Sequence, residues 1–253
     1  MPLYLGSNKI GSLYLGSTKI AKSYLGSSIV YSSSGGSSLP SGLQFLYQAK
    51  DKTSTSIPNK APGSTFGDYL ISGTLTLDGS GSNTYLVNGN SSNNFLYKDL
   101  SSDQLNEMKA ISSTYTYFIR CVKLTSGMGG ILSWRYNKGA NDTYIYMIRA
   151  SEQQLQIHTT TGYSCGSNFL LTTDRVYKVV VSGSNFYAKN LDNNAEYNLT
   201  YSTNRSMGSQ MRTFWAGNGE YDLTRFFAIA GIPRATTAEE DAVMKDTLMN
   251  QSA

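Results

Sequence analysis

The sequence has little charge, little proline and almost no histidine. Charged residues make up 15% of its 253 residues, against about 25% in an ordinary globular protein. It has five prolines and one histidine, and no apolar run approaches the ~20 residues needed to cross a bilayer. We therefore expect no membrane-spanning helix, and no catalytic triad unless His158, which we place on the polar face of a strand, is its base.

Cysteine is also scarce, and the charge balance is mild. Cys121 and Cys165 could form one disulfide, but the N-terminus lacks the basic and apolar regions of a secretory signal. Two small buried thiols are therefore the favoured interpretation, and neither cysteine has the spacing of a metal ligand. Lys and Arg number 21 against 17 Asp and Glu, giving a net charge of +4. The basic residues are scattered, so we expect neither nucleic acid nor a membrane as partner.

The residues that are abundant favour β-structure. The chain has 19 Tyr and 24 Gly, and Ser, Thr and Asn fill much of the remainder. Tyr and Thr favour strands, whereas Gly, Asn and Ser favour tight turns. A helical bundle would need more Ala, Leu, Glu and Lys, so this composition argues against one.

The first thirty residues contain a repeat with a period of ten. Residues 4–10, 14–20 and 24–30 read YLGSNKI, YLGSTKI and YLGSSIV. Each unit predicts a short strand, a Gly-Ser turn and a second short strand, in which Tyr and Leu alternate faces. So short a segment cannot bury a core by itself, which favours an anchor folded against a partner over an unstructured tail. The predicted anchor side chains are Tyr4, Leu5, Tyr14, Leu15, Tyr24 and Leu25.

Tandem units of this kind resemble those at the start of structural proteins of tailed bacteriophages, especially phages and prophages of gut bacteria. The resemblance covers residues 3–31 and implies a virion component that docks onto the particle through residues 1–31. Residues 32–42 are rich in Ser and Gly and predict a flexible linker. We therefore place a single β-rich domain at 43–253.

Short apolar runs separated by turn residues fill this domain. Asp78-Gly79 and Asn88-Gly89 are strong turn signals, and Ser182-Gly183-Ser184 predicts a hairpin. Many short strands at close spacing indicate a sandwich or barrel. Residues 101–111 fit either a short helix or a loop. The predicted strands are residues 42–49, 74–77, 85–87, 115–122, 130–136, 143–148, 154–158, 177–181, 185–189 and 224–233.

The C-terminus predicts a helix that runs to about Met249. Thr236 with Glu239, or Thr237 with Glu240, fits a capping box. The acidic residues at this end suit the positive end of the helix dipole. The side chains expected to point inward are Val243, Met244 and Leu248.

Residues 226–249 resemble the concanavalin A-like lectin/glucanase (LamG-like) family, in which a late strand and an arginine-bearing turn precede a short helix. A looser likeness extends over 43–250 and implies an all-β jelly roll, an antiparallel sandwich of two curved sheets. Hydrolases of this family carry Glu-x-Asp followed by a further acid. Here Glu220-Tyr221-Asp222 is followed by Thr224 and Arg225 where that acid should stand. We therefore expect a protein that is not an enzyme.

Binding is the chemistry that remains. Sugars pack on aromatic rings and bond to Asn, Asp and backbone amides. Two groups of such residues stand out, although aromatic residues in strands are more often core, as we expect for Trp134. The first candidate group is Tyr136, Asn137, Asp142 and Tyr144, and the second is Trp215, Asn218 and Tyr221.

No cofactor is expected. Asp142 beside Asn141, and Asp192 beside Asn193 and Asn194, carry oxygen atoms of the kind that calcium binds, but such residues are usually turn formers. Calcium therefore stays a weakly supported alternative.

Two functions follow from these patterns and resemblances. The first is a virion decoration or fibre protein with a lectin-like domain for cell-surface or mucosal glycans. The second is a structural cement protein that binds no sugar, and a polysaccharide-degrading enzyme is a third, disfavoured reading. In either case the partners are other virion proteins, and the protein would be assembled into the virion in the host cytoplasm. By analogy with phage fibres we expect a homo-oligomer, a trimer.

Overall fold

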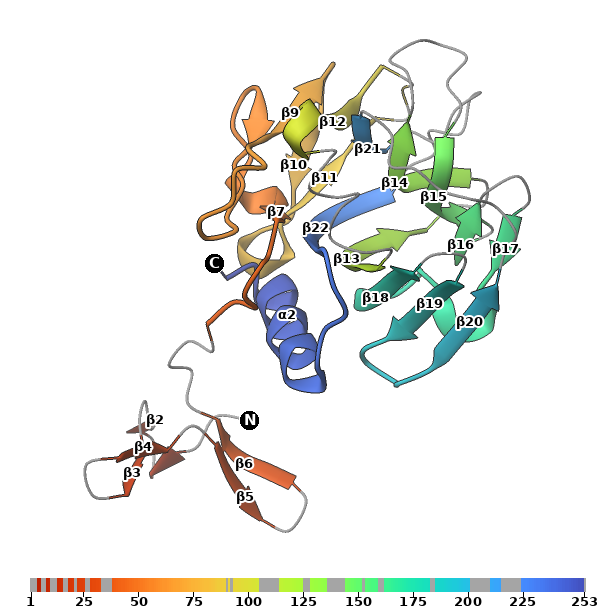
Figure 1. Cartoon of the computed structure of the whole chain (residues 1–253). Helices are drawn as coiled ribbons and strands as arrows, with labels where there is room; N and C mark the ends of the chain where they lie inside the picture. The colour runs from red at the N-terminus through yellow and green to blue at the C-terminus, as the bar shows by residue number, and fades with distance from the viewer. Residues whose placement is uncertain are drawn as a thin grey trace. The chain divides into compact units, whose positions relative to one another are not determined.

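The computed structural model describes most of the chain (Figure 1). It covers residues 38–252 apart from 90, 92, 105–113, 125–127, 136–143, 152, 159–161, 183–184, 201–209 and 215–223, and the six short strands before residue 33. The chain divides into two compact units, residues 1–39 and 40–253. The second unit is called the C-terminal domain below.

The N-terminal unit contains three separate two-stranded antiparallel hairpins, one for each repeat. In each, the Leu of the repeat pairs with the residue three positions later, and the Gly-Ser positions between them lie outside the described residues. The third hairpin has a register shift after Ser23, in the repeat where Ile29 replaces the lysine. The hairpins are β1 (Tyr4–Leu5) with β2 (Asn8–Lys9), β3 (Leu13–Leu15) with β4 (Thr18–Ile20), and β5 (Lys22–Leu25) with β6 (Ser28–Ser32).

The C-terminal domain is an antiparallel β-sandwich of jelly-roll type with a short C-terminal helix, so the predicted fold class is confirmed. We call its two eight-stranded sheets sheet I and sheet II. Sheet I runs β10 (Thr76–Asp78), β11 (Tyr85–Val87), β22 (Thr224–Ile232), β13 (Thr114–Lys123), β18 (Arg175–Ser182), β19 (Asn185–Asn190), β20 (Glu196–Thr200), and β7 (Phe45–Gln48) also pairs with β22. Sheet II runs β17 (Gly162–Ser164), β16 (Gln154–His158), β15 (Tyr144–Ser151), β14 (Met128–Arg135), β21 (Gln210–Thr213), β12 (Phe95–Asp99), β9 (Tyr69–Ser72), β8 (Ser56–Ile57).

Helical elements complete the domain. Three 3-10 turns are η1 (Ala49–Asp51), η2 (Gly81–Asn83) and η3 (Ser167–Phe169), and the helix α2 is Ala238–Asn250. Of the segment 101–111, residues 102–104 are helical and 105–111 lie outside the described residues. The long β-branched and aromatic runs all became strands within a few residues of the predicted ends. The polar or very short strands β8, β9, β12, β17, β20 and β21 were not predicted.

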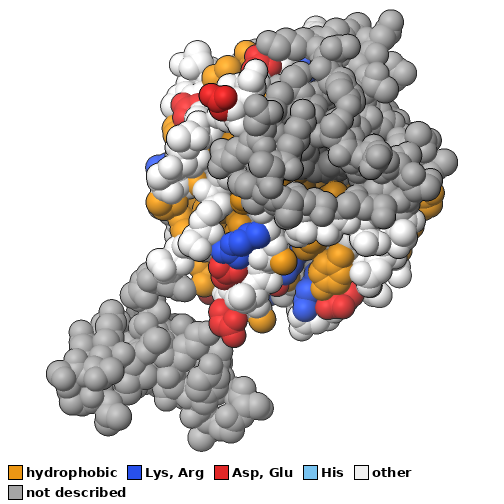
Figure 2. Space-filling model, viewed as in Figure 1, with side chains coloured by type: hydrophobic (Ala, Val, Ile, Leu, Met, Phe, Trp, Pro, Cys, Tyr) orange, Lys and Arg blue, Asp and Glu red, His pale blue; other side chains and the backbone are white. Residues whose placement is uncertain are grey.

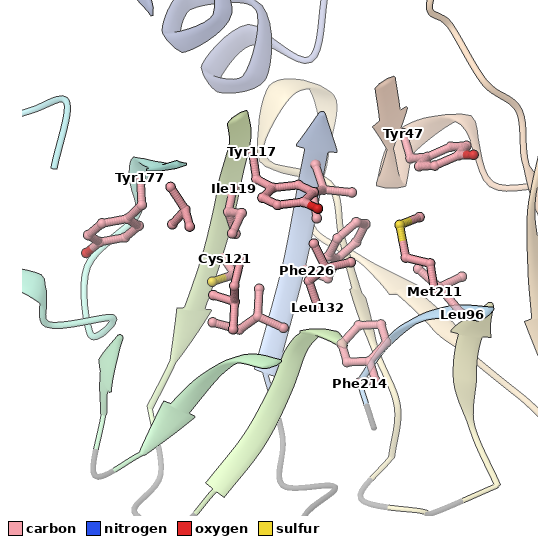
Figure 3. Packing of buried hydrophobic residues seen from close by; sticks show 14 of the residues in the cluster. Tyr47, Leu96, Tyr117, Ile119, Cys121, Leu132, Tyr177, Met211, Phe214 and Phe226 are labelled. Atoms are coloured by element: carbon pink, nitrogen blue, oxygen red, sulfur yellow. The ribbon is translucent and has the colours of Figure 1, made fainter. Parts of the chain in front are cut away.

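The core lies between the two sheets. Tyr117, Ile119 and Cys121 of β13 point into it, together with Leu132 and Met211 from sheet II (Figure 3). Gly231 of β22 is required by this packing, because a Cβ there would overlap the ring of Phe45. Cys121 and Cys165 are both free and buried, as expected, and burial raises the pKa of each thiol to about 12.

Helix α2 covers the outer face of sheet I (Figure 1). The predicted capping box is confirmed as Thr237 with Glu240: the Glu240 amide donates to the Thr237 hydroxyl, and the Thr237 amide donates to the Glu240 carboxylate. Arg234 holds the same carboxylate through two bonds of 2.6 and 2.8 Å. Met244 and Leu248 are buried and Val243 is half-buried, as predicted, while the burial of Thr247 was missed.

The C-terminal end of α2 is fixed by one buried glutamine, Gln251. Gln251 is in the left-handed conformation at φ 45°, and its side chain donates to the carbonyls of Ser82 and Thr84 at 3.0 and 2.6 Å. The Lys50 amide donates back to the Gln251 side-chain oxygen at 3.1 Å. These bonds tie the residue after α2 to η1 and to the η2 region, about 170 to 200 residues earlier in the sequence.

Arg120 lies fully buried on the outer face of β13, between sheet I and the helix. Its Nη1 donates to the Leu248 and Met249 carbonyls at 3.0 and 2.8 Å, near the negative end of the helix dipole. Nε and Nη2 donate to both carboxylate oxygens of Asp174. The guanidinium also lies 4.3 Å from the centroid of the Phe227 ring, so one side chain joins the helix, two strands and a loop.

We predict that Arg120→Leu lowers the free energy of unfolding by about 3 kcal/mol or more, because it leaves the Asp174 charge and two helix carbonyls without their donor. Urea unfolding of the full chain measures this loss. Arg225→Gln is the matched control, since Arg225 also lies over an aromatic ring, that of Tyr85 at 4.8 Å, but is only half-buried. A loss of less than about 1 kcal/mol in R120L would contradict the role given to Arg120.

The capping ion pair makes a second prediction, on acid stability. Arg234 and the Thr237 amide lower the pKa of Glu240 from 4.5 to about 2. Because the folded-state pKa is lowered, the charge stabilises the fold above pH 4.5 and this contribution is lost as the pH falls towards 2. We expect Glu240→Gln to lower the free energy of unfolding by about 1 kcal/mol at pH 7 and to leave it unchanged near pH 2.

Thermal melts of the wild type and E240Q across this pH range measure the difference. Asp246→Asn, on the exposed side of the same helix, is the control and should show no such convergence. A difference between the wild type and E240Q that does not shrink with acidification would refute the assignment.

Candidate functional site

Most of the residues predicted to bind sugar lie outside the described residues. Tyr136, Asn137 and Asp142 belong to the connection between β14 and β15, and only the backbone of Tyr144, the first residue of β15, is described. Trp215, Asn218 and Tyr221 belong to the connection between β21 and β22 and are likewise undescribed. The same holds for Glu220 and Asp222, and for the side chains of Trp134 and His158. Their roles stay predictions.

The strand register nevertheless separates the two groups. The chain leaves β14 at Arg135, which pairs with Gln210 at the start of β21. It leaves β21 at the opposite end, where the Phe214 amide donates to the Gly130 carbonyl at 2.8 Å. Gln210 and Phe214 are four residues apart, or about 13 Å along an extended strand. The two predicted groups are therefore attached at opposite ends of β21.

Between these two attachment points, β21 has one face towards the core and one face away from it. Met211 is packed in the core (Figure 3), and the Thr213 hydroxyl bonds to that of buried Tyr69 at 2.8 Å. Because side chains alternate along a strand, Gln210 and Arg212 occupy the other face. In β12 the side chain of Leu96 lies in the core, so Phe95, Tyr97 and Asp99 are placed on the opposite, outward face.

Six side chains gather on this outward face of sheet II. Cross-strand pairing sets Asp99 opposite Gln210, Tyr97 opposite Arg212, and Ser133 of β14 on the other side of Arg212. We call this group the Arg212 cluster: Phe95, Tyr97, Asp99, Ser133, Gln210 and Arg212.

The members of the Arg212 cluster hold one another in place. The Arg212 guanidinium lies 4.5 Å from the centroid of the Phe95 ring, and its Nε donates to the side-chain oxygen of Gln210. Gln210 in turn donates to the Asp99 carboxylate at 2.6 Å. The rings of Phe95 and Tyr97 meet edge to face at 5.9 Å. These contacts hold the Arg212 guanidinium in one position.

Ser133 is the unusual member. Its side chain is only 1% exposed, and its hydroxyl has no hydrogen-bond partner in the described structure. Buried polar atoms are nearly always paired, so an unpaired one calls for an explanation. Arg212 and Gln210, at 7% and 3% exposed, are also buried although they face away from the core.

Asp192 and Asn193, the residues named above as a weak calcium candidate, bond to other groups of the protein. The Asp192 carboxylate pairs with Lys245 at 2.8 Å and accepts the Val176 amide, while the Asn193 side chain accepts the Ala195 amide at 3.0 Å. These bonds form a turn. Within the described ranges no group of three or more His, Cys, Asp or Glu side chains could hold a metal ion.

The described surface carries charges of both signs. In Figure 2 the basic and acidic side chains lie interspersed, with no extended area of one sign on the described part of the face in view. One surface ion pair joins Lys189 and Glu196 at 3.3 Å. Among the helices that the structure describes, none is long and apolar enough to cross a membrane.

Comparison with known proteins identifies the fold. No protein-family model matches the sequence, and no curated protein matches it. Among solved structures, Trypanosoma rangeli sialidase aligns with 92% of this chain at 11% identity and a TM-score of 0.57. The binding domain of botulinum neurotoxin serotype D/C VPI 5993 aligns with 82% at 10% identity and a TM-score of 0.58. The neurotoxin DC binding domain in complex with SialylT aligns with 82% at 8% identity and a TM-score of 0.57.

The chain spans only 36% of the sialidase and 52% of the toxin domains. At this level of identity the likeness establishes a shared β-sandwich fold. It transfers no residue roles.

Sequence reasoning missed the Arg212 cluster, although two signals were present. Gln210-Met211-Arg212-Thr213 and Phe95-Leu96-Tyr97-Lys98-Asp99 both alternate in the manner of half-buried strands. Neither run is rich in β-branched residues, and only the fold brings them together. Pairing of β12 with β21 joins positions more than one hundred residues apart.

We predict that Ser133→Ala leaves the free energy of unfolding unchanged or raises it by up to about 1 kcal/mol, because a buried unpaired hydroxyl is removed. Thr213→Val on the adjacent strand is the matched control. It removes a buried hydroxyl that bonds to Tyr69, and should cost about 1–2 kcal/mol. Urea unfolding measures both variants, and a comparable loss in S133A would mean that the hydroxyl has a partner in the fold.

Proposed function

We propose that this protein is a bacteriophage virion protein whose C-terminal domain binds surface carbohydrate. The observation that carries the binding function is the pair of half-buried aromatic rings, Phe95 and Tyr97, on the outward face of sheet II. Rings that pack on sugar C–H groups, with polar atoms that hold hydroxyls, are what carbohydrate recognition needs.

The comparisons support this function at the level of fold. The solved structures that share the fold include a sialidase in complex with sialic acid and a toxin binding domain in complex with SialylT. The cluster also lies between the attachment points of the two predicted sugar-binding groups, residues 136–144 and 215–221. Binding without cleavage is proposed, because the sequence lacks the paired acids of a glycosidase.

The virion role rests on the N-terminal repeats. Their resemblance to phage structural proteins, and the three hairpins that they form, support residues 1–31 as an anchor on other virion proteins. Isolated two-stranded hairpins are marginal in water, so such a segment gains stability on a partner. Assembly would take place in the host cytoplasm, as a homo-oligomer for which we propose a trimer.

A glycan panel tests the binding function. We expect the full chain, displayed at many copies on beads, to bind one class of bacterial or mucosal glycan saturably, since weak single sites need avidity to be detected. Ala at Tyr136, Tyr144 or Trp215 should weaken this binding about 3- to 10-fold if that ring packs on the sugar. No binding across the panel would contradict the lectin function and favour a cement protein.

Removal of residues 1–34 tests the anchor. We expect the shortened protein to keep the thermal unfolding transition of the C-terminal domain but to lose attachment to the particle. Immunogold labelling of particles assembled with either form measures attachment. Equal labelling of both forms would refute the anchor.

A further inference from the structure

We propose, on the basis of the anchor role given above to residues 1–31, that the first two hairpins of the N-terminal unit dock onto an acidic protein surface. These hairpins are β1–β2 and β3–β4. The N-terminal unit carries charge of one sign, and its strand register repeats one Tyr–Lys arrangement in both hairpins. Charge and register together define the chemistry of the partner.

The charge of the N-terminal unit is entirely positive. Residues 1–39 contain Lys9, Lys19 and Lys22 and no Asp or Glu. Of the 21 Lys and Arg in the chain, the other 18 lie in residues 40–253 together with all 17 Asp and Glu. The shorter unit therefore holds three of the four net positive charges. An acidic surface attracts this unit, whereas the same hairpins of a second copy repel it.

The strand register repeats one arrangement in the first two hairpins. Tyr4 lies opposite Lys9 in β1–β2, and Tyr14 lies opposite Lys19 in β3–β4. Residues directly opposite each other in an antiparallel pair share a face, so each hairpin has a Tyr and a Lys on one face. The Leu that follows each Tyr is on the other face. A Tyr–Lys face matches a carboxylate next to an apolar area, because an ammonium pairs with the charge and an aromatic ring covers apolar surface.

The third hairpin, β5–β6, lacks this arrangement. Tyr24 lies opposite Ile29, and the register shifts within β5. The cation of this hairpin, Lys22, lies opposite Ser32 at the end away from the turn. Lys22 therefore carries the same charge as Lys19 but has no Tyr opposite it, which separates the effect of net charge from that of the Tyr–Lys arrangement.

The chain between the hairpins is short, so their sites on the partner must be close together. β2 ends at Lys9 and β3 begins at Leu13, and β4 ends at Ile20 and β5 begins at Lys22. An extended chain spans at most about 3.6 Å per residue, which gives about 14 Å for the first connection and about 7 Å for the second. Neighbouring hairpins therefore bind one continuous surface of the partner.

The number of charges favours an acidic protein over a nucleic acid. Three Lys neutralise at most about three phosphates, whereas a protein held by the DNA backbone makes about 6 to 10 such contacts. A Tyr beside each of two Lys adds apolar contact, which the core of a protein interface provides. Because exposed charges are screened by salt, attachment through these hairpins should weaken as the salt concentration rises.

The experiment measures how much of the full chain stays on assembled particles as the NaCl concentration rises. We expect Lys19→Gln to weaken attachment about 2- to 5-fold, and K9Q/K19Q about 4- to 20-fold, because each exposed ion pair contributes little. Lys22→Gln is the matched control, since it makes the same charge change without a Tyr opposite, and should weaken attachment less than about 2-fold. K9R/K19R keeps both charges and should attach like the wild type.

Each alternative has its own outcome. Equal losses in K19Q and K22Q would overturn the Tyr–Lys site. Unchanged attachment of K9Q/K19Q at every salt concentration, or loss of attachment in K9R/K19R, would overturn the acidic partner and leave the anchor intact. Release of the protein by nuclease would identify a nucleic acid as the partner and overturn the inference as well. Attachment of the protein without residues 1–34 would instead overturn the proposed anchor itself.

Discussion

The guanidinium of Arg120 lies between sheet I and helix α2, and it links parts of the domain that are far apart in sequence. It reaches Asp174 in the loop before β18, the carbonyls of Leu248 and Met249 at the end of the helix, and the Ser82 carbonyl in η2. The Arg120 guanidinium is buried because β13 is covered on both faces. Its aromatic and aliphatic residues face the core, and Arg120 faces the helix. A buried cation needs a full set of acceptors, so the surrounding segments are held in one arrangement.

Arg212 on sheet II shares part of this design. Each guanidinium lies over a phenylalanine ring, and each is bonded to a neighbouring side chain. The difference lies in the neighbours: the acceptors around Arg120 belong to the helix and loops of the fold, whereas beside Arg212 a buried hydroxyl has no partner. The full set of acceptors around Arg120 makes it a stabilising residue.

The sequence predicted those features that depend on neighbouring residues. Strands with runs of β-branched and aromatic residues, such as β13 and β22, follow from local propensity, and the capping box of Thr237 and Glu240 follows from a spacing of three. The Arg212 cluster could not be predicted in this way, because it requires knowing that β12 pairs with β21 and β21 with β14. The role of Arg120 was hidden for the same reason: nothing in its own strand indicates a helix that begins 118 residues later.

The two units of the chain differ in how their strands are paired: in two eight-stranded sheets in the C-terminal domain, and in three separate hairpins in the N-terminal unit. The C-terminal domain buries a continuous core between two large sheets and ties its own helix back with Arg120 and Gln251, so its stability is internal. Each repeat of the N-terminal unit pairs two short strands in a sheet of its own, and an isolated two-stranded hairpin is marginally stable in water. Near-identical repeats of marginal stability are suited to binding equivalent surfaces, as in an assembly built of many copies.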